Sequence, residues 1–284
     1  MSNILLRAVT AEEKALFKQD GVVCLRQIIA PEWVDAARDG IEELRTAPGP
    51  YASIVDKGEL LLYVDQMPSV FNEKLRRVAL ESGTAAIARA LHDDVEMRWV
   101  FDQIFYKGKG IVAETPWHQD TPYGCFDGMG LIRVWMPVDH VPRETTIEVV
   151  RGSHLWNVEY GTTEATVFEE NKDHTKNSGF DYTARATEVN PPVPNIEASR
   201  GSFDIIGHAV EPGDVVVFNY HVLHHAAAGE NRADARRAFA VIYGDDKVSF
   251  RKRPNMVPSV LEHFGKAWKE GQRFSDFPDI FPVA

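Results

Sequence analysis

The sequence predicts a mainly β fold with flanking helices, in which a sandwich or barrel forms after about residue 94. Two observations support this prediction. From Val95 onward, runs rich in Val, Ile, Phe, Trp and Tyr follow one another and are separated by Gly, Pro and Asp. Before that point, apolar residues recur mainly at helical spacing. Because the strand runs do not alternate with helical runs, a parallel sheet built from βαβ units is not expected.

The N-terminal region, about residues 1–94, has several helix signals. Thr10 and Glu13 have the spacing of a capping box, and Pro31 stands where a first helical residue is expected. The expected elements are a helix over 10–21, a short strand over 21–29, a helix over 31–47 and a helical segment over 72–94.

The remainder of the chain divides into a strand-rich core, about 95–250, and a C-terminal tail, about 251–284. Within the core, residues 157–200 are polar and irregular, which predicts an insertion or lid because long loops of this kind usually have a function. We expect one domain over residues 1–284. The predicted strands lie at 95–107, 131–141, 145–152, 201–210, 214–226 and 236–244, and a helical patch at 257–271.

The composition disfavours some classes of function and some cellular locations. The chain has 284 residues, 44% of them hydrophobic, and a formal net charge of −11. A chain of this length buries a large core without disulfides, and its two cysteines fit a reducing compartment. The acidic balance disfavours nucleic acid and anionic membranes as partners. No membrane-spanning run or signal peptide is recognised, so we expect a cytoplasmic protein; the sequence does not indicate its oligomeric state.

A His-x-Asp step is the most informative local feature. His118 and Asp120 are two residues apart, so on an extended strand they face the same side. Two histidines and one carboxylate form the facial triad of non-haem Fe(II) oxygenases, and this step supplies two of the three ligands. The spacing is common by chance, and on its own it favours a surface His and Asp beside a turn.

A later segment supplies candidates for the third ligand. His221, His224 and His225 follow one another there, and Arg236 and Arg237 begin the next predicted strand. A guanidinium binds a carboxylate through two parallel hydrogen bonds, so an arginine at this place suits a dicarboxylate cosubstrate. The combination of His-x-Asp, a distal His and a following Arg is much more specific than any of its parts.

With these motifs in order, the chain resembles the phytanoyl-CoA dioxygenase family of Fe(II)/2-oxoglutarate-dependent oxygenases. The resemblance covers most of the chain and implies a double-stranded β-helix, which is a jelly-roll, cupin-like barrel. The matching segments are an N-terminal helix–strand–helix opening at 17–41, the metal-binding segment at 115–123, a Gly-Ser-His turn at 149–156 and the distal segment at 212–243.

The resemblance implies that His118 and Asp120 bind the metal. It assigns the third ligand to His224, and His225 and His221 remain alternatives. Arg236 is the expected partner of the far carboxylate of 2-oxoglutarate. Arg237 is the alternative, since adjacent strand residues point to opposite faces.

Three further residues are candidates for the cosubstrate pocket. Thr115 and Trp135 match family positions that line it, and Gln103 is a polar amide between inward-facing aromatic residues. The structural alternatives are a turn hydroxyl, core packing and a cross-strand hydrogen bond. Arg133 has two interpretations, a partner for a substrate carboxylate or an exposed strand arginine, and the second is favoured.

The implied activity is oxidation of a small organic molecule with Fe(II), 2-oxoglutarate and O2, releasing succinate and CO2. Because Asp120 occupies the position that halogenating relatives leave to a small residue, hydroxylation or another outcome without halide is expected. The sequence does not identify the substrate, or choose among hydroxylation, desaturation, cyclisation and epimerisation. The alternatives are a cupin-like metal enzyme that does not use 2-oxoglutarate and a catalytically silent jelly-roll binding protein.

Overall fold

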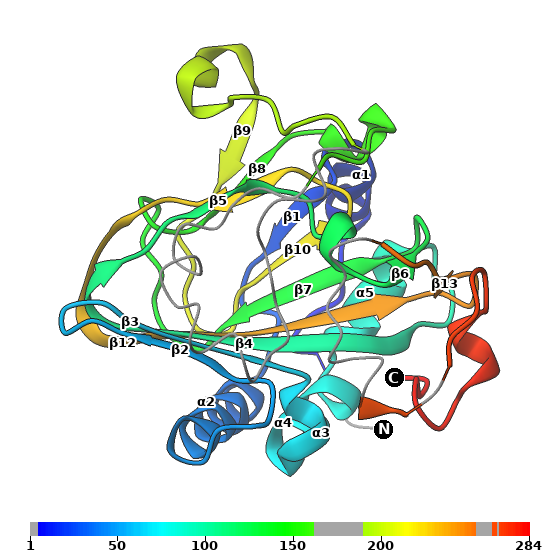
Figure 1. Ribbon diagram of the computed structural model, residues 1–284, viewed down its shortest axis with the longest axis horizontal. Helices are drawn as coiled ribbons and strands as arrows, with labels where there is room; N and C mark the ends of the chain where they lie inside the picture. Colours follow the sequence, from blue (N-terminus) through cyan, green and yellow to red (C-terminus); the bar gives the residue numbers. More distant parts are fainter. Residues whose placement is uncertain (1–4, 162–189, 254–262, 266) are drawn as a thin grey trace.

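Two antiparallel sheets face each other and form the barrel in the computed structural model (Figure 1). The major sheet has seven strands in the order β1-β10-β7-β12-β4-β3-β2, and the minor sheet has four in the order β5-β11-β8-β9. Helices pack on the outer face of the major sheet. This arrangement confirms the predicted mainly β fold with flanking helices and its jelly-roll barrel. The structure describes residues 5–161, 190–253, 263–265 and 267–284.

The helices and strands have the following bounds. The helices are α1 (Ala11–Asp20), α2 (Pro31–Thr46), α3 (Pro68–Phe71), α4 (Glu73–Glu81) and α5 (Thr84–Leu91). The strands of the major sheet are β1 (Val22–Leu25), β2 (Ser53–Asp56), β3 (Leu61–Gln66), β4 (Arg98–Val112), β7 (Ile132–Pro137), β10 (Val215–Asn219) and β12 (Gly229–Gly244). The other strands are β5 (Thr115–His118), β6 (Phe126–Asp127), β8 (Ile147–Val150), β9 (Ile205–Gly207), β11 (His224–Ala226) and β13 (Ser249–Phe250).

The local signals in the N-terminal region correspond to real elements. The Thr10 hydroxyl accepts from the backbone N–H of Glu13, whose carboxylate accepts in return from the backbone N–H of Thr10. Pro31 is the first residue of α2. The sequence did not predict β2 and β3, which extend the major sheet beyond β4. Most of the expected insertion (residues 162–189) lies outside the described residues, as do residues 257–262 and 266 of the expected helical patch. Residues 267–271 of that patch are described and are not helical.

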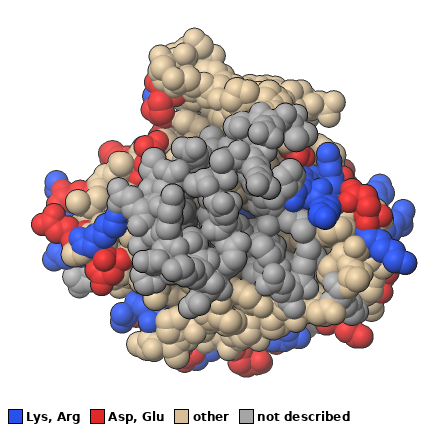
Figure 2. Space-filling model, in the orientation of Figure 1, with Lys and Arg blue, Asp and Glu red and all other residues tan. Residues whose placement is uncertain are grey.

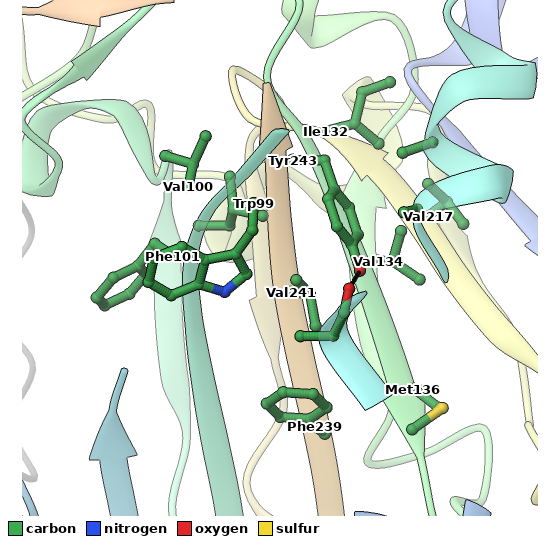
Figure 3. Close-up of a cluster of buried hydrophobic side chains, with 14 of the residues drawn as sticks. Trp99, Val100, Phe101, Ile132, Val134, Met136, Val217, Phe239, Val241 and Tyr243 are labelled. Atoms are coloured by element: carbon green, nitrogen blue, oxygen red, sulfur yellow. Dashed lines mark hydrogen bonds between the residues drawn. The ribbon is translucent and has the colours of Figure 1, made fainter. Parts of the chain in front are cut away.

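Strand β12 divides the interior of the protein into two sides. Phe239, Val241 and Tyr243 pack in the core on the helical side of the major sheet (Figure 3). The Tyr243 hydroxyl donates to the carbonyl of Ala79 and shares a second hydrogen bond with Thr84, so its polar atom is satisfied. Each such aromatic or aliphatic side chain stabilises the fold by about 1.5–3 kcal/mol on burial.

On its other side, β12 faces the minor sheet and the space inside the barrel. Ala238 and Ala240 alternate there with the residues of the helical side. Because their side chains are small, they leave room for a cavity between the sheets. Ala238 lines that cavity, and Arg236 lies two residues before it on the same face.

The described surface charges are mixed in sign on the face shown in Figure 2. On the face shown in Figure 2, the coloured basic side chains lie among acidic ones and do not gather into one basic surface. None of the helices described has the length and apolar character needed to cross a membrane.

Candidate active site

Three side chains on the minor sheet and the turn beside it converge, and two of them, His118 and His224, line the cavity. His118 ends β5 and His224 begins β11, and these residues are direct partners in the antiparallel pairing. The Nε2 atoms of His118 and His224 lie 3.8 and 3.7 Å from the same oxygen, Oδ1 of Asp120. One ligand atom from each of the three residues lies within 4.8 Å of the others, which is close enough to hold one metal ion.

Backbone carbonyls orient both imidazole rings. His118 Nδ1 is 2.7 Å from the carbonyl oxygen of Pro116, and His224 Nδ1 is 3.2 Å from that of Val222. When each Nδ1–H donates to its carbonyl, each Nε2 lone pair is free and faces Asp120. This is the usual outer hydrogen bond of a metal-binding histidine.

The protonation states also suit metal binding. Burial lowers the pKa of His224 to about 3, with a further contribution from the neighbouring His118, and burial lowers that of His118. Burial alone would raise the pKa of Asp120, but the Arg133 charge and the two histidines bring it below its usual value. Neutral imidazoles beside an ionised carboxylate are the forms that bind a divalent metal. Two such nitrogens and one oxygen fit Fe(II).

The cavity beside this cluster has a volume of about 90 Å³. His118 and His224 line it from the minor sheet, and Arg236 and Lys107 line it from the major sheet. The aromatic side chains of Phe105, Trp135 and Phe218 complete much of the wall. A mostly apolar pocket with a few charged groups is typical of a small-molecule site.

Arg236 and Arg237 both border the cavity, but their guanidinium groups lie on opposite faces of β12. The Arg236 guanidinium is buried and donates to the carbonyl of Thr145 at 2.6 Å. No carboxylate of the described chain pairs with it, and burial lowers its pKa to about 10. In contrast, Arg237 binds both oxygens of Asp139, at 2.8 and 2.6 Å, and reaches Glu42 of α2. Arg236 is therefore the arginine that has hydrogen-bonding capacity left for a ligand carboxylate.

Lys107 is a second cation in the cavity, and the sequence interpretation missed it. It is the direct cross-strand partner of Arg236, is buried, and donates to the carbonyl of Ala113 at 3.2 Å. Burial, with a contribution from Arg236, lowers its pKa to about 7. The sequence contained a signal for this position. Gln103, Phe105 and Lys107 alternate along β4, so they share one face of the strand.

The three candidate pocket residues have different surroundings. Thr115 and Trp135 both line the cavity. Gln103 is not among the lining residues, and its amide oxygen accepts a hydrogen bond of 2.6 Å from Arg133. The favoured interpretation of Arg133 was wrong, because this side chain is buried and lies beside Asp120.

The two alternative histidines do not join the cluster. His225 stacks on Trp117 with ring centroids 4.3 Å apart, and its Nε2 lies 2.8 Å from Glu148. His221 contacts the Thr121 hydroxyl and a backbone carbonyl. Trp117 and His225 are each adjacent in sequence to a cluster histidine, so their stack supports the pairing of β5 with β11, and His225 also borders the cavity.

Comparison with known proteins identifies the family. The family model for phytanoyl-CoA dioxygenase matches residues 17–239. No curated protein matches the chain. Among solved structures, the non-haem α-ketoglutarate-dependent carbocyclase SnoK from nogalamycin biosynthesis superposes with a TM-score of 0.69 at 20% identity, over 97% of this chain and 96% of SnoK.

Two further structures share the fold. The epimerase SnoN, also from nogalamycin biosynthesis, gives a TM-score of 0.72 at 17% identity over 96% of each chain. EctD from S. alaskensis with 2-oxoglutarate and 5-hydroxyectoine gives 0.61 at 18% identity, over 88% of this chain and 80% of EctD. Because the family model covers most of the sequence, the chain belongs to the phytanoyl-CoA dioxygenase family and is a non-haem iron- and 2-oxoglutarate-dependent oxygenase.

Proposed function

We propose that the protein hydroxylates, or otherwise oxidises, a small organic molecule in this cavity, with His118, Asp120 and His224 as the Fe(II) ligands. The observation that carries the proposal is that the two histidines of this cluster line the same cavity as two cations that pair with no carboxylate of the described chain. When bound, iron supplies the oxidising chemistry, using O2 and 2-oxoglutarate and releasing succinate and CO2.

Arg236 and Lys107 are the proposed binding groups for the far carboxylate of 2-oxoglutarate. The fork of Arg236 suits two parallel hydrogen bonds to a carboxylate, and Lys107 adds a second charge from the neighbouring strand. Since both side chains are buried, a carboxylate there interacts with them in a medium of low effective dielectric constant. Their common position on the major sheet leaves the other end of the ligand directed toward the minor sheet.

The remaining lining residues position the ligand and exclude water. Trp135 and Phe218 supply apolar walls, and the Thr115 hydroxyl supplies a hydrogen-bonding group beside the cluster. Excluding water strengthens each charge interaction in the site and protects reactive species from side reactions. The ionised Asp120 favours hydroxylation, or another oxidation without halide.

Two observations support the expected partners and location. The charges of the described surface in Figure 2 are mixed, which fits a small-molecule substrate better than a polyanion. Cys24 and Cys125 are free thiols, which fits a reducing compartment such as the cytoplasm.

Uncoupled turnover tests the proposal without knowledge of the substrate. The protein is supplied with Fe(II), ascorbate, 2-oxoglutarate and O2, and succinate is measured. We expect slow succinate formation in the wild type, a loss in His224→Ala and a strong reduction in Arg236→Met. Metal binding without succinate formation and without 2-oxoglutarate binding would contradict the proposal and favour a metal enzyme that does not use this cosubstrate.

A further inference from the structure

The two oxygens of Asp120 have different surroundings. Oδ1 faces the Nε2 atoms of His118 and His224, at 3.8 and 3.7 Å. Oδ2 faces the Nε atom of Arg133 on β7, at 3.2 Å. The Asp120 and Arg133 side chains are both nearly inaccessible, so water does not screen this ion pair strongly.

Arg133 is itself held in place. Its Nη2 donates to the Gln103 amide oxygen at 2.6 Å. Gln103 is on β4 and Arg133 on β7, and these strands lie on either side of β12, so the bond spans the middle of the major sheet. Asp120 is the one carboxylate that pairs with Arg133 within the described ranges. The guanidinium is therefore fixed by one sheet and lies beside a carboxylate that approaches from the other, in an ion pair that lacks hydrogen-bond geometry.

This asymmetry matters because a carboxylate can bind a metal through one oxygen or through two. Two histidines and one carboxylate oxygen leave three positions open on a six-coordinate ion. A chelating 2-oxo acid takes two of these positions, and O2 needs the third. If Asp120 also contributed Oδ2, one of the three would be lost.

We propose that Arg133 is a positioning residue that holds Oδ2 of Asp120 away from the metal, so that Asp120 binds through Oδ1 alone. The proposal rests on the iron site proposed above. The opposing explanation is that Arg133 only neutralises a buried charge, in which case the number of open metal positions does not depend on it.

Counting metal-bound water distinguishes the two explanations without enzyme activity. Mn(II) replaces Fe(II) in the whole protein, and broadening of its EPR lines in 17O-enriched water gives the number of bound waters. We expect three waters in the wild type, two in Arg133→Met and in Arg133→Gln, and three in Arg133→Lys, which keeps a cationic donor. Arg98→Met is the matched control. Arg98 is a largely buried strand arginine at the start of β4, and it pairs with Glu96 and not with Asp120.

A second experiment removes the carboxylate instead of the arginine. In Asp120→Ala, Arg133 loses its acidic partner, so we expect added formate to enter its place and to tighten Mn(II) binding at least tenfold, about 1.4 kcal/mol. In the double variant Asp120→Ala/Arg133→Met, formate should change Mn(II) affinity less than twofold. Circular dichroism of each variant checks that it is folded.

The outcomes separate this inference from the proposed function. Three waters in folded Arg133→Met or Arg133→Gln, or equal formate effects in the single and double variants, would overturn the positioning role and leave the iron site intact. A wild type that binds no Mn(II) would overturn both. If neither neutral variant folds, the formate comparison decides, because the double variant retains no unpaired buried carboxylate at position 120.

Discussion

The charged residues on the two faces of strand β12 differ in whether they pair with carboxylates. On the outer face, Arg237 has its guanidinium saturated by Asp139 and Glu42. On the inner face, Arg236 and its neighbour Lys107 are buried with only backbone carbonyls as acceptors in the described chain. The ion pairs of the outer face stabilise the attachment of helix α2. On the inner face, two buried cations without carboxylate partners lower the stability of the ligand-free protein. The difference indicates that the outer face of the sheet contributes stability and the inner face binds the ligand.

The largest expected effect comes from removing the metal ligands at the cavity wall. His224→Ala leaves two of the three donor atoms, so metal binding weakens strongly and succinate formation falls by about a thousandfold or more. Anaerobic Fe(II) titration and succinate assays measure this. His140→Ala, at an exposed histidine beside Glu211, is the control and should retain both properties.

The two arginines of β12 should give opposite results when each is replaced by methionine. Arg236→Met removes a buried cation without breaking a carboxylate pair, so we expect about a hundredfold weaker 2-oxoglutarate binding and little loss of stability. Arg237→Met leaves Asp139 with only the longer contact to Arg38, at 3.9 Å, so the free energy of unfolding should fall by about 1–3 kcal/mol with 2-oxoglutarate affinity unchanged. Calorimetric titration and urea unfolding provide the two measurements. Equal effects of both substitutions on binding would remove the distinction between the faces.

Lys107 makes the free energy of unfolding depend on pH. Its pKa is about 7 in the fold, against an ordinary value of 10.5, because of burial and then Arg236. Between these two pH values the unfolded chain binds more protons than the folded protein, so stability rises with pH. Burying the charged lysine therefore destabilises the fold most below about pH 7, and this destabilisation disappears as pH rises toward 10.5. Lys107→Met should therefore stabilise the protein most below pH 7.

The same lysine should take up a proton when 2-oxoglutarate binds. At pH 8 the free site holds Lys107 mostly neutral, and a carboxylate beside it favours the charged form. Titration calorimetry in buffers of different ionisation enthalpy should detect proton uptake in the wild type and none in Lys107→Met. Identical uptake in both proteins would assign the proton to another group.

The smallest effect is expected at His225, which follows the proposed ligand His224 in the sequence and also borders the cavity. His225→Phe preserves the stack on Trp117 but loses the contact with Glu148. We expect metal affinity to fall by about tenfold or less, because His225 acts on the ligands only through the pairing of β5 with β11. A competition assay with a chelator measures the change. A loss as large as that of His224→Ala would mean that the two histidines had been assigned in the wrong order.

The parts of the site that the sequence predicted are those encoded locally. His118 and Asp120 share a strand face because of their spacing, and the order of motifs along the chain pointed to His224. In contrast, β12 is apolar on both faces, so its sequence could not show whether Arg236 or Arg237 points inward. That choice follows from the packing of Phe239, Val241 and Tyr243 against the helices.

The missed features depend on contacts between distant segments. The Arg133–Asp120 pair joins β7 to the turn after β5, and Lys107 meets Arg236 only through the pairing of β4 with β12. Neither pairing has a local pattern. Strands β2 and β3 were missed because they are short apolar runs between two helical segments, and a short run does not distinguish a strand from a helix. The single-domain prediction over 1–284 remains a prediction.

The most direct test of the account is an anaerobic absorption titration of Fe(II) protein with 2-oxoglutarate, comparing wild type, Arg236→Met and Arg237→Met. We predict a weak visible charge-transfer band in the wild type and in Arg237→Met at similar 2-oxoglutarate concentrations, and in Arg236→Met only at much higher ones. A band that weakens in Arg237→Met but not in Arg236→Met would contradict the assignment of ligand binding to the inner face of β12.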